Sequence, residues 1–277
     1  MRIVNLESWV DFPKAIADIR REFGSRMIKH GDERQAILKN EILFRGQSDN
    51  QWELKTTLER VTAEKYSVQR YMERADSVAN EIESQTENRW QLPTYPDIVK
   101  EILAKQDSMR PHLPPPCYEY LVYLRHHGFP SPLLDWTRSP YIAAYFALEQ
   151  LDDAKHGSVF AFIERPGGGK YFRGGDVMIR SMGSYITTHV RHFAQKAEYT
   201  IATRWDEDAK THDFFSHHAV TPSPDQDILI KITIPRTDRI PALQQLEDYN
   251  INRHTLFQSE DSLVQALGLR AFELDGA

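Results

Sequence analysis

The chain has 277 residues, of which 40% are hydrophobic and 27% are charged, so it is long enough to bury a core of its own. Its formal net charge of −6 provides no overall attraction to nucleic acid, and its single cysteine, Cys117, excludes an internal disulfide. The N-terminus lacks the pattern of a secretion signal, and no apolar run reaches the roughly 18 residues of a membrane span. These features predict a cytoplasmic protein without membrane contact.

Residues 1–40 are expected to form an N-terminal helical segment. Apolar residues recur at helical spacing between residues 6 and 23, among them Trp9, Phe12 and Ile16. Residues 24–40 are charged and are expected to continue as a helix or a loop.

The next apolar run, Ile42-Leu43-Phe44, leads into Arg45-Gly46-Gln47 and predicts a strand that presents Arg45 at its end. Gly46 has no side chain and therefore permits a close approach or a turn. Residues 59–110 are rich in charged helix formers and predict a helical insert, which Pro93 and Pro96 interrupt.

A helix is expected from Cys117 to His127, with Gly128 just after its end. The polar run Asp135-Trp136-Thr137-Arg138-Ser139 then leads into a second, apolar helix. Ser139 suits the cap of that helix and Pro140 its first position. Polar side chains held at such a junction suit a functional site.

The second half of the chain is rich in strands. Beta-branched and aromatic runs predict strands at residues 157–163, 197–202 and 228–234, a loop or hairpin at 206–226, and helices at 240–249 and 263–272. Strands and helices do not alternate regularly. The pattern therefore predicts an α+β fold in a single domain over residues 1–277.

Two segments resemble the FRG domain family. The first is Phe44-Arg45-Gly46-Gln47, with Trp52 beyond it. The second is the run from His126 to Pro140, which resembles the family's His-His-Gly-Leu-Pro-Thr-Arg-Leu-Leu-Asp-Trp-Thr, with Ser131 and Pro132 in place of its Thr and Arg. The resemblance covers about residues 40–270 and implies a bacterial or phage protein of a defence or toxin system.

A more distant resemblance links the chain to ADP-ribosyltransferases of the Arg–Ser–Glu type. Phe44-Arg45-Gly46 resembles their first motif, Thr137 and Ser139 their second, and Glu198-Tyr199 their third, in the same order along the chain. This resemblance implies an ADP-ribosyltransferase-like split sheet with a helical insert and an N-terminal helix. It also implies NAD as the substrate, with cleavage of the nicotinamide–ribose bond and no metal.

The resemblance assigns the catalytic roles to Glu198, Arg45, Ser139 and Thr137. Contacts to NAD are expected from Arg45, Gly46, Gln47, Asp135, Trp136, Tyr145 and Gln195. The residue types suit this chemistry, because a guanidinium pairs with a diphosphate and a carboxylate stabilises an oxocarbenium-like transition state. The sequence leaves open whether the acceptor of ADP-ribose is a protein, a nucleic acid or water. It also leaves the oligomeric state open.

The sequence also permits other interpretations of these residues. Arg45 is equally suited to a buried ion pair with Asp135, and Tyr145 to the core. A binding module that senses a nucleotide or a phage component needs the same arginine and aromatic residues. A metal-dependent hydrolase is the third alternative, because histidines are frequent after residue 120, including His126, His127, His189, His192, His212, His217 and His218.

Overall fold

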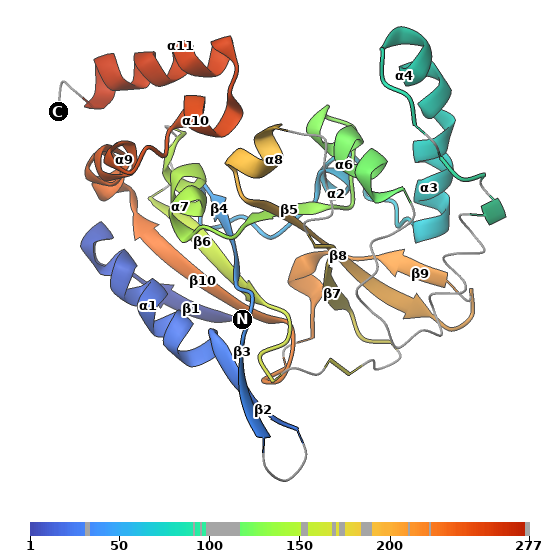
Figure 1. The fold of residues 1–277 in the computed structure, drawn as a ribbon, viewed down its shortest axis with the longest axis horizontal. Helices are drawn as coiled ribbons and strands as arrows, with labels where there is room; N and C mark the ends of the chain where they lie inside the picture. Colours follow the sequence, from blue (N-terminus) through green and yellow to red (C-terminus); the bar gives the residue numbers. More distant parts are fainter. Residues whose placement is uncertain are drawn as a thin grey trace.

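The computed structural model describes residues 1–30, 34–90, 92–94, 96–97, 117–150, 155–167, 170–171, 175–183, 190–209, 211–221 and 223–274. At its centre lies an eight-stranded sheet in the order β1-β10-β6-β4-β5-β8-β7, with β9 paired to β8 (Figure 1). The strands are β1 Arg2–Asn5, β4 Leu43–Gln47, β5 Leu134–Thr137, β6 His156–Ile163, β7 Met178–Ser181, β8 Ala197–Asp206, β9 Thr211–Phe214 and β10 Ile228–Pro235. Only β1 and β10 pair in parallel among these strands, so the sheet is mostly antiparallel.

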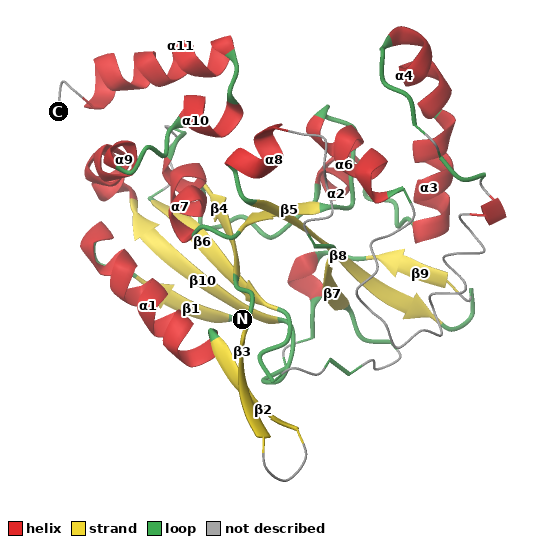
Figure 2. Cartoon of the chain, in the orientation of Figure 1, coloured by secondary structure: helices red, strands yellow, loops and turns green. Residues whose placement is uncertain are grey.

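Helices surround this sheet (Figure 2). They are α1 Phe12–Phe23, α2 Thr57–Val61, α3 Val68–Ser77, α4 Ala79–Gln85, α6 Tyr118–His126, α7 Pro140–Leu148, α8 Val190–Ala194, α9 Arg239–Asp248, α10 Arg253–Phe257 and α11 Glu260–Leu269. The expected mixture of helices and strands is confirmed. None of the described helices is long and apolar enough to cross a bilayer.

Three apolar clusters hold the layers together. The largest packs α1, α7 and α9 against β6 and β10. The second packs α3 and α6 against β8. The third is centred on Trp136 and Phe160 and contains residues of β4, β5 and β6. Burial of apolar surface on this scale is the main stabilising contribution to such a fold. The helices α3 and α4 lie at the side of the molecule opposite to α1 (Figure 1).

The N-terminal region differs from the expectation. A helix at 12–23 is present, but residues 25–39 form a hairpin of β2 Ser25–His30 and β3 Arg34–Lys39 instead of a helix or loop. This hairpin projects away from the rest of the chain (Figure 2). Strand β1 was also not predicted, because a four-residue edge strand is set by its distant partner β10 and shows no periodicity of its own. The segment expected as a helical insert contains most of α2 and all of α3 and α4, and residues 98–116 lie outside the described part.

The junction between β5 and α7 is built as predicted. The Ser139 hydroxyl accepts a hydrogen bond from the backbone N–H of Ile142, and Pro140 occupies the first turn. Gly46 explains the close packing of β4 against α7, because a Cβ atom there would lie 1.9 Å from the carbonyl oxygen of Ala143. Any side chain at this position therefore forces β4 and α7 apart.

Candidate functional site

A cavity of about 380 Å³ opens beside β4 and β5. Arg45 and Gln47 come to it from β4, and Asp135, Trp136 and Thr137 from β5. Helices α2 and α6 add Arg60, Arg125 and His126, and β8 adds Ala197 and Tyr199. The two motifs that the sequence singles out thus meet at one cavity.

Arg45 and Arg125 converge on Asp135. Nη2 of Arg125 donates to Oδ2 of Asp135 at 2.5 Å, and Nη1 of Arg45 lies 3.9 Å from the same oxygen. Nη1 of Arg45 also donates to the Asp135 carbonyl at 2.7 Å. Burial lowers the pKa of Arg45 to about 10, and Asp135 opposes this shift while Arg125 and Arg60 add to it. Arg45 therefore stays cationic at neutral pH, and the ion pair with Asp135, which was the alternative interpretation of Arg45, is present.

Aromatic rings also line the cavity. Phe146 of α7 and Phe257 of α10 meet edge to face with ring centres 6.1 Å apart. The guanidinium groups of Arg191 and Arg253 lie 5.5 and 4.9 Å from the centre of the Phe257 ring. Glu149 also lines the cavity and pairs with Arg253. Such an aromatic and cationic wall suits the face of a planar base.

Thr137 and Gln195 line the cavity, whereas Ser139 does not. The Thr137 hydroxyl donates to the carbonyl of Gln195 at 2.7 Å and accepts from the N–H of Ser139 at 3.1 Å. The side chain of Gln195 donates to the Leu256 carbonyl at 3.1 Å and so ties α8 to α10. Thr137 therefore fixes the turn that precedes β8, and Ser139 caps α7.

Trp136 and Tyr145 are both buried, and each donates a hydrogen bond to another side chain. The indole N–H of Trp136, a residue that lines the cavity, donates to the Thr200 hydroxyl at 2.7 Å, and that hydroxyl bonds His217 at 2.8 Å. Tyr145 is buried in the largest apolar cluster, donates its hydroxyl to Glu149 at 2.9 Å and does not line the cavity. Of the alternatives for Tyr145, the core position is the one observed.

Glu198 lies between two lining residues but does not line the cavity itself. Ala197 and Tyr199 flank it on β8, and side chains alternate between the faces of a strand. Its side chain is 0% exposed and pairs with Arg138, whose Nε also pairs with Glu41 at 2.8 Å. Burial raises the pKa of Glu198 to about 7, Glu41 adds to this shift and Arg138 opposes it.

The family comparison covers part of the chain. Residues 40–156, which are 117 of the 277 residues, match the model of the FRG domain. No curated protein and no solved structure matches the chain.

The FRG match runs from before β4 to the first residue of β6 and includes both motifs of the sequence. The cavity, however, extends beyond this match. Arg191, Gln195, Ala197, Tyr199 and Phe257 line it and lie after residue 156. The FRG segment therefore supplies most of the lining, including both Arg45 and Phe146, and the later part of the chain completes it.

The sequence did not single out three of the lining cations, Arg60, Arg125 and Arg191. Arg125 directly precedes the His-His-Gly of the middle motif, which was the available signal. Arg60 and Arg191 lie on the short helices α2 and α8 with no motif around them. Only the folded chain brings these residues to the cavity.

The histidines do not converge in the described part of the chain. No group of three His, Cys, Asp or Glu residues suited to a metal ion occurs there, and His189 lies outside it. His126 bonds the Tyr199 hydroxyl at 2.7 Å, and His217 is buried against Thr200.

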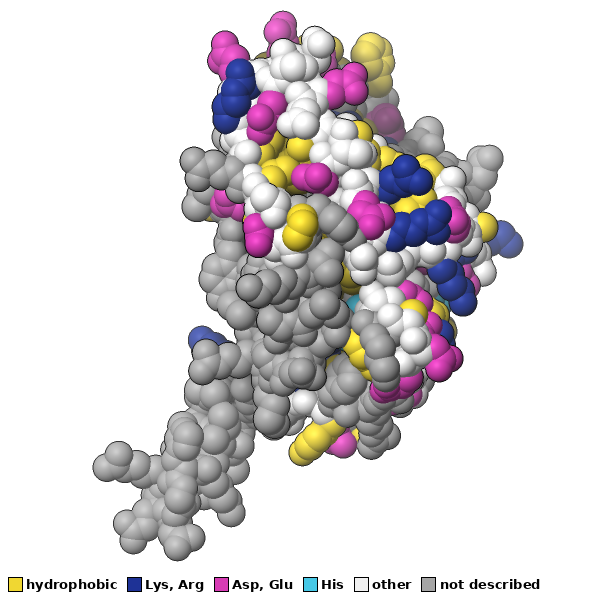
Figure 3. All heavy atoms as spheres, turned by 90° about the vertical axis from the view of Figure 1, so that its right-hand side faces the viewer, with side chains coloured by type: hydrophobic (Ala, Val, Ile, Leu, Met, Phe, Trp, Pro, Cys, Tyr) yellow, Lys and Arg dark blue, Asp and Glu magenta, His cyan; other side chains and the backbone are white. Residues whose placement is uncertain are grey.

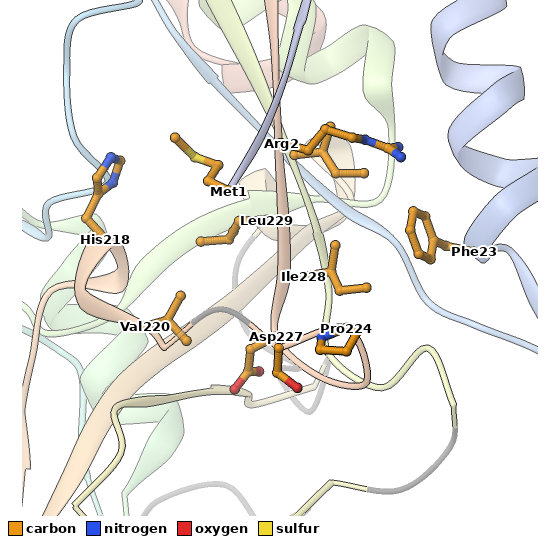
Figure 4. A pocket seen from close by; sticks show the side chains of 11 residues that line it. Met1, Arg2, Phe23, His218, Val220, Pro224, Asp227, Ile228 and Leu229 are labelled. Carbon is orange, nitrogen blue, oxygen red and sulfur yellow. The ribbon is translucent and has the colours of Figure 1, made fainter.

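A second cavity, of about 380 Å³, lies between the N-terminal segment and the start of β10 (Figure 4). Its walls are mostly apolar and include Phe23, Val220 and Ile228. The two charged side chains at its edge already have partners, because Arg2 pairs with Glu22 and Asp227 with Lys170. Among the described residues, this cavity therefore offers no cluster of charged side chains like the one beside Arg45.

Proposed function

We propose that this protein binds NAD in the cavity beside β4 and β5. The observation that carries the proposal is that this cavity brings a cluster of arginines together with aromatic rings. Arg45 and Arg125 meet at Asp135, Arg60 adds positive charge beside Arg45, and Phe146 and Phe257 line the same cavity. A dinucleotide needs both, because guanidinium groups pair with its diphosphate and aromatic rings stack on its bases.

We further propose that bound NAD is cleaved at the nicotinamide–ribose bond, as an ADP-ribosyltransferase or an NAD glycohydrolase would do. Strands β4, β5 and β8 are neighbours in the sheet and carry Arg45, Thr137 and Glu198 in that order, which supports this assignment. The electron pair of the broken C1′–N bond leaves with nicotinamide. The oxocarbenium-like ribose is then attacked at C1′ by water or by an acceptor group, which loses a proton.

Glu198 is proposed as the carboxylate that stabilises this transition state. To do so it has to leave Arg138 and turn toward the ribose, because the observed ion pair occupies Oε1. A pKa of about 7 means that half of the Glu198 side chains are ionised near neutral pH. A role in a defence or toxin system, in which the protein consumes NAD of the cell, fits this reaction.

The alternative is a module that binds a nucleotide without cleaving it. The position of Glu198 favours this alternative, since its carboxylate is absent from the lining of the cavity. Both proposals require ligand binding at Arg45, and they differ only in turnover.

The test is incubation of the purified chain with NAD while released nicotinamide is measured. Glu198→Gln keeps the shape of the side chain and removes its charge, and Glu87→Gln, at an exposed position, is the matched control. Cleavage predicts release by the wild type and the control, with a loss of about 100-fold or more in Glu198→Gln. NAD binding without any release, with or without cell extract, supports the binding module instead.

A further inference from the structure

Three arginines from three different elements meet at one end of the cavity. Arg45 lies on β4, Arg60 on α2 and Arg125 on α6, and all three line it. Arg45 and Arg125 share the carboxylate of Asp135, because both approach its Oδ2 atom, and Arg60 acts on Arg45 as a further positive charge. Three positive charges against one negative charge leave a formal surplus of two positive charges at this end.

The surplus is not neutralised within the described part of the chain. Arg60 is exposed and forms no ion pair with a carboxylate there. The Nε atoms of Arg45 and Arg125 are buried and have no hydrogen-bond acceptor among the described residues. Buried donors normally have a partner, so these unused N–H groups indicate a ligand that accepts hydrogen bonds.

We propose that Arg45, Arg60 and Arg125 form a subsite for a phosphomonoester group of a nucleotide. A phosphomonoester carries about −1.5 to −2 charges at neutral pH and three terminal oxygens. The diphosphate bridge of NAD carries the same total charge, but it divides this charge between two phosphates, each with two free oxygens. Three guanidinium groups that approach one point from three elements complement the three terminal oxygens of a single monoester more closely. The inference deepens the proposed function, since the arginines that pair there with the diphosphate of NAD would take a phosphomonoester in preference, and it rests on that function only for the nucleotide that bears the phosphate.

The positive surplus beside Arg45 belongs to a chain that is acidic as a whole. The whole chain carries a formal net charge of −6. On the face formed by the side of α3 and α4, the described Lys and Arg side chains are interspersed with Asp and Glu (Figure 3). A nucleic acid backbone needs an extended basic surface, whereas a small phosphorylated ligand needs one local site. The small ligand is therefore the class that the charges favour.

Calorimetric titration with two adenine nucleotides tests this subsite. Adenosine 5′-monophosphate bears a monoester dianion, and 3′,5′-cyclic adenosine monophosphate bears a diester monoanion on the same base and sugar. We expect the monoester to bind at least about tenfold more tightly to the wild type, the scale of one charge-assisted hydrogen bond. Arg60→Ala should remove most of this preference, whereas Arg74→Ala, an exposed arginine on α3, should keep it.

Equal affinity for the two nucleotides, or equal behaviour of the two arginine variants, overturns the phosphomonoester subsite. Titration with NAD and NADP in parallel separates this result from the proposed function. NAD binding that needs Arg45 but gains nothing from the extra phosphate of NADP preserves the proposed function and rejects the subsite. Binding of the monoester without any binding of NAD preserves the subsite and rejects NAD as the ligand. Arg60 is exposed, so its substitution should leave the melting temperature unchanged.

Discussion

Arg138 pairs with Glu198, a carboxylate without exposed surface, and at the same time with Glu41 at the molecular surface. The backbone N–H of Arg138 also donates to the carbonyl of Lys196 at 3.1 Å, in the turn before β8. Lys196 has a positive φ of 47°, a conformation that non-glycine residues adopt rarely. Arg138 therefore fixes both the turn and the carboxylate that follows it.

The raised pKa of Glu198 predicts a pH dependence of stability. Its folded pKa of about 7 exceeds the usual 4.5, so between these values the folded state holds more protons than the unfolded state. Stability should fall as pH rises through this range, by at most about 3 kcal/mol. Urea unfolding at about pH 5 and about pH 8 measures this, and Glu198→Gln should flatten the profile. An equally steep profile in the variant contradicts the assignment.

Asp135 should hold the two arginines in place. Asp135→Asn removes the charge that Arg45 and Arg125 share and leaves two cations side by side. Because Asp135 is about one-third exposed, we expect a loss of about 1–2 kcal/mol in the free energy of unfolding, less than for a fully buried pair. Asp18→Asn removes the carboxylate of an exposed pair with Arg21 and should cost less than about 1 kcal/mol. Equal costs in a denaturant titration argue against a special role for Asp135.

The variant Ser139→Ala tests whether Ser139 acts only as a helix cap or also takes part in catalysis. Loss of the cap should lower the free energy of unfolding by about 1 kcal/mol. Ser67 caps α3 in the same way, away from the cavity, so Ser67→Ala should cost a similar amount. Nicotinamide release should be alike in both variants if Ser139 acts only as a cap. A selective loss of release in Ser139→Ala supports the catalytic role that the resemblance implies.

Gly46→Ala should destabilise the chain strongly, because the new methyl group meets the backbone of α7. Overpacking of this kind costs about 1–3 kcal/mol or more. Gly268 of α11 has open space around it, so Gly268→Ala should stabilise its helix by about 0.5–1 kcal/mol. Thermal unfolding of the two variants provides the comparison, and a tolerated Gly46→Ala contradicts the close packing of β4 on α7.

Local signals predicted the elements that position the site. The apolar run at 42–47 and the cap at Ser139-Pro140 are features of a few consecutive residues, and both are present as expected. The hairpin at 25–39 and strands β1 and β7 were missed, because short strands take their structure from partners elsewhere in the chain.

The candidate site was predictable only in part. Arg45, Asp135 and Thr137 were selected from motifs, and all three line the cavity. Arg60 and Arg191 arrive there through tertiary packing, which leaves no pattern in the sequence. Glu198 does not line the cavity. Its neighbour Tyr199 does, and neighbouring side chains on a strand point to opposite faces. Similarity in motif order alone does not determine which face of a strand a residue occupies.

The most direct measurement is a calorimetric titration of NAD into the wild type and into Arg45→Gln, with Arg74→Gln as the control. We expect the wild type and the control to bind NAD equally and Arg45→Gln to bind it at least about tenfold more weakly. Absence of NAD binding, or unchanged binding in Arg45→Gln, contradicts the assignment of this cavity to NAD.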